Sequence, residues 1–410
     1  MQDSLTVLDN GLRLHVKKAP LHSVAVSAVV GYGSLNEFEH PETSGSAHFL
    51  EHMLFKGTTN RSCKQILSEA RDFGIYQNAS TEYDNIAYLT LSSKAGFDVA
   101  VSLLSDMVRN SVLPAEELEK ERGAIIGEIM QDADDPDQIL SQYMMRALFG
   151  NRPPSLPIAG TLESVKRISR ERLLDIYKSS HTPDNMVLIA YGNLDKKHAV
   201  RKLTGAFGDF EGKASFKKAY FDIPRPRAIE KTLERKEISQ ANARMAFLVP
   251  NGNTKNIYGR KMKEALVSLS DILDNRLMDT VREKRGLVYS IYSKIEIIPS
   301  FGTFWIEFGC KPSDVEIIRS LCADEIQKLR DGELERSEFI KSKQYRSWVN
   351  GLILDKPRDY VDWYGIYAAE YTALPNPRSF NEIKLEDVVD AADRYLDTDK
   401  AVNILMVPKK

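Results

Sequence analysis

Apolar and polar residues alternate along the start of the chain in the manner of β-strands. In LTVLDNGLRLHVKKA, residues 5–19, two alternating runs flank an Asn-Gly pair, which predicts a hairpin. The next run, HSVAVSAVVGYG at residues 22–33, is rich in β-branched residues and ends in glycines. This composition predicts another strand, so the chain is expected to begin with a sheet.

From Pro41 the apolar spacing becomes that of a helix. Its apolar positions are Ala47, Leu50, Leu54 and Phe55. Thr43 and Ser44 offer N-caps, and Gly57 would end the helix.

Three more elements follow along the chain. Residues 85–93 have the pattern of a strand, and residues 95–111 that of an amphipathic helix. Residues 113–131 predict a second helix, because Pro114 and several acidic residues stand in its first turn. The segment ADDPD, residues 133–137, is expected to end that helix.

A stretch without apolar periodicity, residues 211–232, divides the chain nearly in half and is rich in Lys, Arg and Pro, as linkers are. The order strand, helix, acidic helix occurs in residues 88–121 and again in residues 304–342, which indicates an internal duplication. Strands and helices do not alternate regularly. We therefore expect an α+β fold of two homologous domains, 1–210 and 233–410, each a mainly antiparallel sheet packed with helices.

Composition narrows the class of protein. At 410 residues the chain exceeds one compact core, and its net charge of -2 gives no electrostatic reason to expect nucleic acid or an anionic membrane as a partner. The cysteines Cys63, Cys310 and Cys322 are scattered, which favours a reducing compartment over a disulfide framework. No apolar leader or membrane-spanning run is present, so a cytoplasmic location is expected. An organelle matrix is the alternative if a targeting segment has been removed.

Two of the seven histidines lie four residues apart in HFLEH, residues 48–52. On a helix, His48 and His52 share a face with Cβ atoms roughly 5–6 Å apart, so both can bind one ion. Glu51 shares that face. A catalytic zinc site usually has three protein ligands, and a nearby carboxylate can take a proton from water. The pattern therefore favours a metal site over a chance arrangement on a buried helix.

The helix predicted at residues 113–131 offers Glu128 as a third ligand. Gly123 and Gly127 in its interior are each unfavourable by about 1 kcal/mol relative to alanine. They predict that another helix packs closely beside Glu128. Glu121 lies two turns before Glu128 and faces the same way, where it can orient a ligand histidine. A solvated acidic face is the alternative for both glutamates.

Four segments follow one another in the order and spacing of the inverted-zincin (H-x-x-E-H) metallopeptidases. They are GSAHFLEHMLFKGT, NASTEYDNIAY, EKERGAIIGEIMQDADDPD and LPIAGT. The chain resembles this family, which includes pitrilysin, insulin-degrading enzyme and the mitochondrial processing peptidase, most clearly in residues 5–165 and again in REKRGLVYS. Its length is similar to that of the half-size, processing-peptidase-like members, in which two two-domain chains face each other.

The resemblance implies a role for each matched residue of the first half. His48, His52 and Glu128 would bind one Zn²⁺ per chain. Glu51 would be the general base, and Glu121 would support the ligands from the outer shell.

The resemblance also implies where substrate binds. Asn78 and Ala79 match the edge strand on which family members lay the substrate backbone. Arg282 and Tyr289 match the pair in the second half that holds the substrate or the tetrahedral intermediate. The first domain would then be the zinc-binding catalytic domain, and the second would bind substrate without a metal site.

The expected function is a zinc-dependent endopeptidase that cleaves short or unstructured polypeptides, including basic, presequence-like peptides. An acidic group either selects basic residues or forms a solvated helix end. Its members are Asp132, Asp134, Asp135 and Asp137. One alternative is a non-catalytic or partner-dependent peptide-binding subunit, against which the complete ligand set with Glu51 argues. A metal-dependent hydrolase of another substrate would need a small closed pocket.

A homodimer is expected rather than a heterodimer. Some processing-peptidase subunits carry a long glycine-rich loop where this chain has LSDILDNRLMDTVREK. Moreover, the zinc ligands and the Arg/Tyr pair occur in one chain, whereas heterodimers of the family often divide them.

Overall fold

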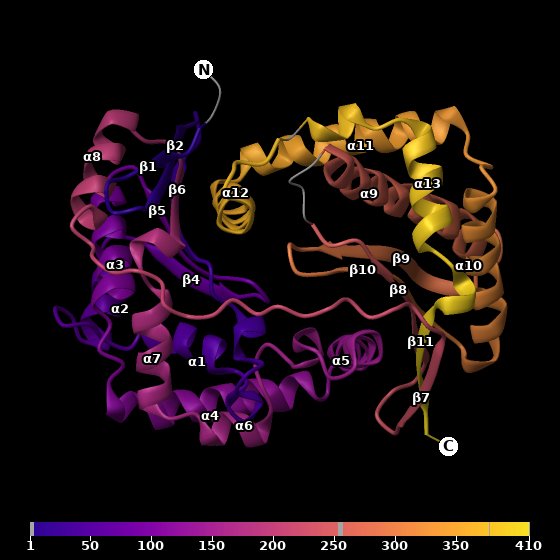
Figure 1. The fold of residues 1–410 in the computed structure, drawn as a ribbon, viewed down its shortest axis with the longest axis horizontal. Coiled ribbons are helices and arrows are strands. Elements are labelled where there is room, and N and C mark those ends of the chain that lie inside the picture. The colour runs from indigo at the N-terminus through magenta and orange to yellow at the C-terminus, as the bar shows by residue number, and fades with distance from the viewer. Residues whose placement is uncertain (1–3, 253–256, 377, 410) are drawn as a thin grey trace. The chain divides into compact units, whose positions relative to one another are not determined.

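The computed structural model describes residues 4–252, 257–376 and 378–409 (Figure 1). The chain forms two compact units, each made of three separate segments. The first unit comprises Met1–Gln131, Leu156–Ala219 and Gly351–Pro375. The second comprises Asp132–Ser155, Tyr220–Asn350 and Asn376–Lys410. In the described part, no helix is long and apolar enough to span a membrane.

The first unit is built on a six-stranded sheet in the order β1-β2-β6-β3-β5-β4. Its strands are β1 (Thr6–Val7), β2 (Arg13–Lys18), β3 (Ser23–Val30), β4 (Tyr76–Thr81), β5 (Ile86–Ser93) and β6 (Met186–Gly192). Among the strand pairs of this sheet that the structure describes, only β2–β6 is parallel. The predicted hairpin is confirmed, since β1 pairs with β2 and Gly11 takes a φ of +88° in the turn. Strand β4 pairs with β5 alone and forms an edge of the sheet.

The described part of the first unit contains eight α-helices beside this sheet. The predicted helices at residues 95–111 and 113–131 correspond to α3 and α4. The helices are α1 (Ser46–Leu54), α2 (Cys63–Asp72), α3 (Phe97–Asn110), α4 (Ala115–Asp132), α6 (Leu162–Arg167), α7 (Arg170–Ser180), α8 (Lys196–Phe207) and α12 (Pro357–Tyr371). Short 3-10 helices include η1 (Ser34–Glu37), η2 (Pro41–Thr43) and η4 (Pro183–Asn185).

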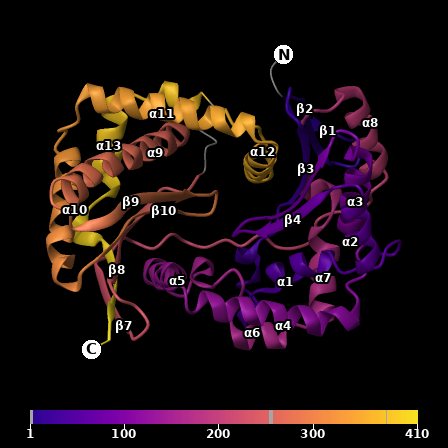
Figure 2. The ribbon, with the colours of Figure 1, turned by 180° about the vertical axis from the view of Figure 1, so that it is seen from behind.

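Both faces of the first sheet are buried. Successive side chains of a strand point to opposite faces, so each strand contributes to two apolar clusters. On one face, Val26 of β3 belongs to the same core as Phe49 of α1. On the other face, Val29 packs in a cluster with Tyr360 and other residues of α12. A Cβ at Gly365 of α12 would lie 2.9 Å from Val29, so this glycine lets the helix approach the sheet closely. Figures 1 and 2 show α12 on the face opposite α3 and α8.

The second unit has a five-stranded sheet in the order β7-β11-β8-β10-β9. Its strands are β7 (Ile229–Arg235), β8 (Ala241–Val249), β9 (Val288–Ile297), β10 (Gly302–Cys310) and β11 (Val402–Pro408). Its helices are α5 (Pro136–Phe149), α9 (Ile257–Leu277), the π-helix η5 (Met278–Glu283), α10 (Val315–Arg330), α11 (Arg336–Asp355), which ends in the first unit, and α13 (Leu385–Tyr395). Short 3-10 helices lie at η3 (Pro153–Ser155), η6 (Pro312–Asp314), η7 (Ser379–Glu382) and η8 (Thr398–Lys400). The chain between α8 and β7, residues 208–228, forms neither helix nor strand.

The two sheets repeat one topology. The order β2-β6-β3-β5-β4 in the first unit corresponds to β7-β11-β8-β10-β9 in the second. The single parallel pairing, β2 with β6, corresponds to that of β7 with β11, and the remaining pairings are antiparallel. The predicted fold class, two homologous α+β domains with mainly antiparallel sheets, is confirmed.

Each sheet is covered by a helix from the opposite half of the sequence. Helix α12 covers the first sheet, whereas α5 packs in the second unit, where the rings of Phe149 and Phe301 are 5.0 Å apart. Arg244 of β8 is 1% exposed and forms ion pairs with Asp137 of α5 and Glu307 of β10. Asp137, from the acidic segment of the sequence, is therefore used inside this unit. Asp135 caps α5 by accepting the Asp137 N–H at 2.8 Å.

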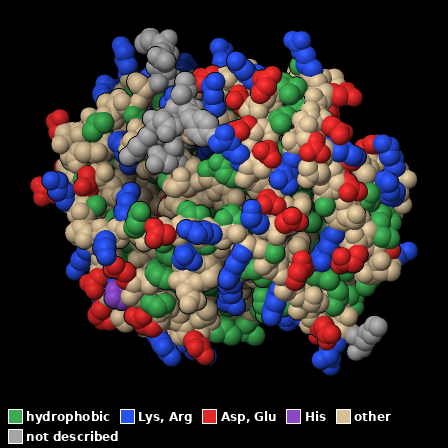
Figure 3. Space-filling model, turned by 45° about the vertical axis from the view of Figure 1, so that its right-hand side comes forward, with side chains coloured by type: hydrophobic (Ala, Val, Ile, Leu, Met, Phe, Trp, Pro, Cys, Tyr) green, Lys and Arg blue, Asp and Glu red, His purple; other side chains and the backbone are tan. Residues whose placement is uncertain are grey.

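Figure 3 shows charged side chains of both signs on one face of the molecule. On the face drawn in Figure 3, acidic and basic groups are interspersed, in keeping with the net charge of -2. Such interspersed charges give no long-range field of one sign on that face.

Candidate metal centre

The HFLEH segment lies within α1, as the apolar spacing predicts. The predicted N-caps Thr43 and Ser44 are wrong, because Thr43 belongs to the 3-10 helix η2 and the N-cap is Gly45, with a φ of +92°. The carboxylate of Glu37 caps the helix instead. It accepts the N–H of Gly45 at 2.6 Å and also that of Ala47.

Glu37 is 1% exposed and lies at the end of η1. Burial raises the pKa of Glu37 to about 8, although the hydrogen bonds from Ala47 and Gly45 oppose that shift. A buried acceptor at a helix N-terminus satisfies N–H groups that no intrahelical carbonyl can reach. Glu37 therefore fixes where α1 begins, and the sequence pattern did not reveal it.

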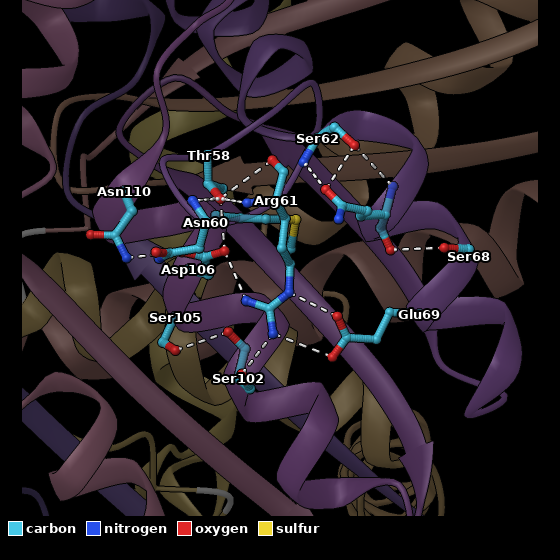
Figure 4. A network of polar contacts seen from close by, with 12 residues as sticks. Thr58, Asn60, Arg61, Ser62, Ser68, Glu69, Ser102, Ser105, Asp106 and Asn110 are labelled. Carbon is cyan, nitrogen blue, oxygen red and sulfur yellow. Dashed lines mark hydrogen bonds and ion pairs between the residues drawn. The ribbon is translucent and has the colours of Figure 1, made fainter.

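The loop after α1 is held by a polar network around Asp106 of α3 (Figure 4). Asp106 accepts hydrogen bonds from Thr58 at 2.7 Å, from Asn60 at 2.7 Å and from Arg61 at 2.8 Å. Burial raises the pKa of Asp106, but hydrogen bonds from Asn110, Arg61 and other donors outweigh it and lower the pKa overall. Buried carboxylates thus hold both the start of α1 and the loop that follows it.

The three predicted ligands come together at one point. The Nε2 atoms of His48 and His52 are each 3.7 Å from Oε2 of Glu128, which α4 supplies. Among the described residues these form the one group of three His, Cys, Asp or Glu side chains with donor atoms within 4.8 Å of one another. Zinc bonds of about 2.0–2.1 Å in a tetrahedron set donors roughly 3.4 Å apart. Both histidine-to-glutamate distances exceed this spacing by about 0.3 Å and the remaining donor pair lies within 4.8 Å, so the donor set suits zinc.

The protonation of His48 and the contacts of His52 both suit the binding of a cation. Burial, with a smaller effect of His52, lowers the pKa of His48 to about 4, so the ring is neutral near pH 7, as a metal ligand must be. Oε2 of Glu121 lies 3.2 Å from Nδ1 of His52. Nζ of Lys56 lies 2.6 Å from Oε1 of Glu121. Glu121 can thus hold the His52 ring with Nε2 directed toward Glu128.

Glu51 lies on the same helix and is 9% exposed. Its Oε2 accepts a hydrogen bond of 2.7 Å from the hydroxyl of Thr81, at the end of β4. Burial raises the pKa of Glu51, and the bond from Thr81 opposes that shift. Thr81 is a contact that sequence reasoning missed, although it lies in the segment NASTEYDNIAY that carries the family resemblance.

Gly123 and Gly127 do not serve close helix packing, so that prediction is wrong. A Cβ at either glycine would meet no atom within 4 Å. Both lie on the exposed face of α4, and the side chain of Glu128 is 46% exposed. The structure gives no packing reason for these two glycines.

The residues assigned to substrate binding lie on the edge strand β4 and, in the second unit, on η5 and the edge strand β9. Asn78 and Ala79 lie on β4, opposite Leu89 and Tyr88 of β5, and the other side of β4 is unpaired. In the second unit, the guanidinium carbon of Arg282 lies 5.4 Å from the ring centroid of Tyr289, which is 85% exposed.

Arg282 belongs to η5, a π-helical turn of a kind often found at functional sites, and Tyr289 to the edge strand β9. The structure thus brings the cation and the phenol side by side within one unit. The zinc ligands belong to the other unit.

Comparison with known proteins identifies the family. The family described as Insulinase (Peptidase family M16) matches residues 14–162, and the family described as Peptidase M16 inactive domain matches residues 167–345. An uncharacterized zinc protease of Streptomyces coelicolor is 30% identical over 341 residues, which cover 82% of this chain and 73% of that protein. The chain belongs to peptidase family M16. The predicted family resemblance is confirmed.

A second relative of the M16 chain is an uncharacterized zinc protease of Bacillus subtilis, 30% identical over 369 residues, which cover 85% of this chain and 87% of that protein. Together with the family match, these relatives show that the M16 chain is a metalloprotease. Their names support zinc as its cofactor.

Solved structures share the fold of the M16 chain. A protease from Helicobacter pylori has a TM-score of 0.90 at 20% identity, covering 99% of this chain and 100% of that one. A peptidase M16 inactive domain from Pseudomonas fluorescens has a TM-score of 0.87 at 20% identity, covering 100% and 98%. At these identities the likeness concerns the fold alone.

Proposed function

We propose that the chain is a zinc-dependent endopeptidase that cleaves short or unstructured polypeptides, with one zinc ion per chain. The observation that carries the proposal is the convergence of His48, His52 and Glu128 beside the buried carboxylate of Glu51. A zinc ion held by these three ligands would polarise the scissile carbonyl and make an attacking water more acidic.

Glu51 then acts as the general base. It takes a proton from the attacking water and returns it to the leaving amine, as a carboxylate with a raised pKa can do. Glu121 keeps the His52 ring oriented during this cycle.

The unpaired side of β4 supports an extended substrate. A peptide that adds as a further strand beside Asn78 and Ala79 would bind through its backbone, which requires a segment free of its own secondary structure. Arg282 and Tyr289 would hold the substrate or the oxyanion with charge and a phenol hydroxyl.

We further propose that residues 1–210 form the catalytic domain and that residues 233–410, after the linker 211–232, bind substrate. The proposal includes a homodimer in the cytoplasm. It rests on the complete set of site residues in one chain and on the scattered cysteines.

The decisive experiment compares the wild-type chain with Glu51→Gln, each with equal bound zinc, on a mixture of unstructured basic peptides analysed by mass spectrometry. We expect cleavage by the wild type and at least about a 100-fold loss in the variant. Glu69→Gln, which changes a half-buried carboxylate of α2 that pairs with Arg61, serves as a control that keeps activity. No cleavage by the zinc-loaded wild type would support the alternative of a peptide-binding subunit.

A further inference from the structure

The general base proposed above is held by a hydroxyl from the strand proposed to bind substrate. Thr81 donates to Oε2 of Glu51 at 2.7 Å, and both residues are buried. Among the described residues Glu51 has no other hydrogen bond, so Oε1 is the oxygen left for a water. A short bond between two buried groups is formed without competition from solvent.

Thr81 has little freedom to move. Its backbone lies opposite Ile86 in the β4–β5 ladder, and its β-branched side chain restricts rotation about χ1. The turn that follows is closed by the Glu82 N–H, which donates to the backbone carbonyl of Asn85 at 2.8 Å. The hydroxyl is therefore attached to a rigid part of the sheet.

The segment from Gly33 to Glu37 connects this turn to the start of α1. The N–H of Ser34 donates to the carbonyl of Glu82 at 3.1 Å, and a Cβ at Gly33 would lie 2.4 Å from that carbonyl oxygen. At the other end of the segment, Glu37 caps α1. The same short segment thus fixes both the helix that carries Glu51 and the turn beside Thr81.

We propose that Thr81 is a positioning residue that holds the carboxylate of Glu51 in its reactive orientation, so that the substrate-binding strand also sets the geometry of the base. This inference rests on the proposed function. Ala79 and Thr81 are two residues apart on β4 and share a face, whereas Asn78 points to the opposite face. The strand β4 would therefore position both the bound peptide and the carboxylate of Glu51.

The test is Thr81→Val, which keeps the shape of the side chain and removes the hydroxyl, with Thr81→Ser as the conservative variant. The matched control is Thr90→Val on β5, since Thr90 is fully buried but its hydroxyl contacts the carbonyl of Val26 at 3.5 Å. The substrate is the peptide cleaved fastest in the mass spectrometry experiment. The measurements are kcat, KM, zinc affinity by chelator competition and melting temperature.

We expect Thr81→Val to lower kcat by about tenfold to 100-fold, with KM and zinc affinity within twofold of wild type. Thr81→Ser should stay within threefold of wild type, and Thr90→Val should behave as wild type. In the background of Glu51→Gln, Thr81→Val should add no further loss, because its effect passes through Glu51.

Three results would overturn the inference: an unchanged kcat in Thr81→Val, a defect that serine does not rescue, or an additive loss in the double variant. These results differ from failure of the proposed function. That failure appears as cleavage by Glu51→Gln at the wild-type rate, or as no cleavage by the zinc-loaded wild type, which would overturn both proposals.

Discussion

The two units share a sheet topology but differ in the side chains on the helix that follows the third strand of the common order. In the first unit α1 follows β3 and carries His48, Glu51 and His52. In the second unit α9 follows β8, and no histidine of the chain occurs after His198. The two units therefore share a fold, and the donor atoms on one helix determine whether a unit can bind a metal.

The carboxylates of α9 are used for structure. Asp271 accepts a hydrogen bond of 2.5 Å from Nε of Arg346 on α11. Asp274 accepts the hydroxyl of Ser293, on the edge strand β9, at 2.7 Å and also its backbone N–H. In the first unit the corresponding kind of contact is the bond from Thr81 to Oε2 of Glu51, and in both units one oxygen of the carboxylate accepts from the edge strand. The helix-to-edge-strand contact therefore occurs in both units, and the two histidines beside Glu51 are what distinguish the first unit.

The largest expected effect comes from removing a metal ligand in the first unit. His52→Ala should abolish peptide cleavage and weaken zinc binding by more than about 100-fold, because two donors remain where three are needed. Asp274→Asn in the second unit should keep wild-type zinc affinity. Isothermal titration with zinc checks both variants. If both variants lost zinc affinity equally, the assignment of the metal site to the first unit would be wrong.

A smaller effect is expected from the second unit's exposed pair. Tyr289→Phe should lower kcat by about 100-fold with unchanged zinc content, because a phenol that stabilises an oxyanion is lost. Tyr220→Phe is the matched control, since Tyr220 is an 89% exposed tyrosine of the same unit. Steady-state kinetics on a fluorogenic peptide measure the effect. If Tyr289→Phe behaves as Tyr220→Phe, the second unit has no part in the reaction.

A third effect concerns the support of His52. Glu121→Gln should weaken zinc binding by about 10-fold to 100-fold, because the carboxylate that orients the ring is lost. Glu119→Gln, an exposed change on the same helix, should have no effect. Chelator competition resolves the difference. Unchanged zinc affinity in Glu121→Gln would show that Glu121, like Glu119, has no role in zinc binding.

The smallest effects are on stability, and they have opposite signs in the two units. In the first unit, burial lowers the pKa of His181 to about 3. Its unfolded-state pKa is about 6.5, so its contribution is present above pH 6.5 and is lost as the pH falls toward 3. In the second unit, burial raises the pKa of Asp274 to about 6 from 3.8. Its contribution is present below pH 3.8 and is lost as the pH rises through 6.

Urea unfolding at several pH values between about 3 and 8 measures these contributions. His181→Gln should reduce the loss of stability on acidification, and Asp274→Asn should reduce the loss between pH 3.8 and 6. Parallel pH profiles for wild type and both variants would contradict the assigned pKa shifts.

Local periodicity was sufficient to predict much of the fold. The hairpin of β1 and β2, the strands β3 and β5, and the helices α3 and α4 all follow from apolar spacing and turn residues within short windows. The pairing of His48 with His52 was equally predictable, because helical geometry alone brings residues four apart together.

Contacts between distant parts of the chain were not predictable in this way. Thr81 is 30 residues from Glu51, and Asp106 is 48 residues from Thr58. No periodicity encodes such pairings, since they depend on how the elements pack. Gly123 misled for a related reason: a glycine in a helix is compatible with close packing and with an open surface, and the sequence does not distinguish them.

The exchange of α5 and α12 between the sheets has a consequence for how the chain is made. The apolar face of the first sheet that includes Val29 and Ile189 is covered only after α12, which ends at Tyr371, has left the ribosome. The first unit therefore cannot complete its core during synthesis until nearly all 410 residues have been translated. Cutting the chain within residues 208–228 would leave each fragment with an uncovered apolar sheet face, which favours aggregation over independent folding.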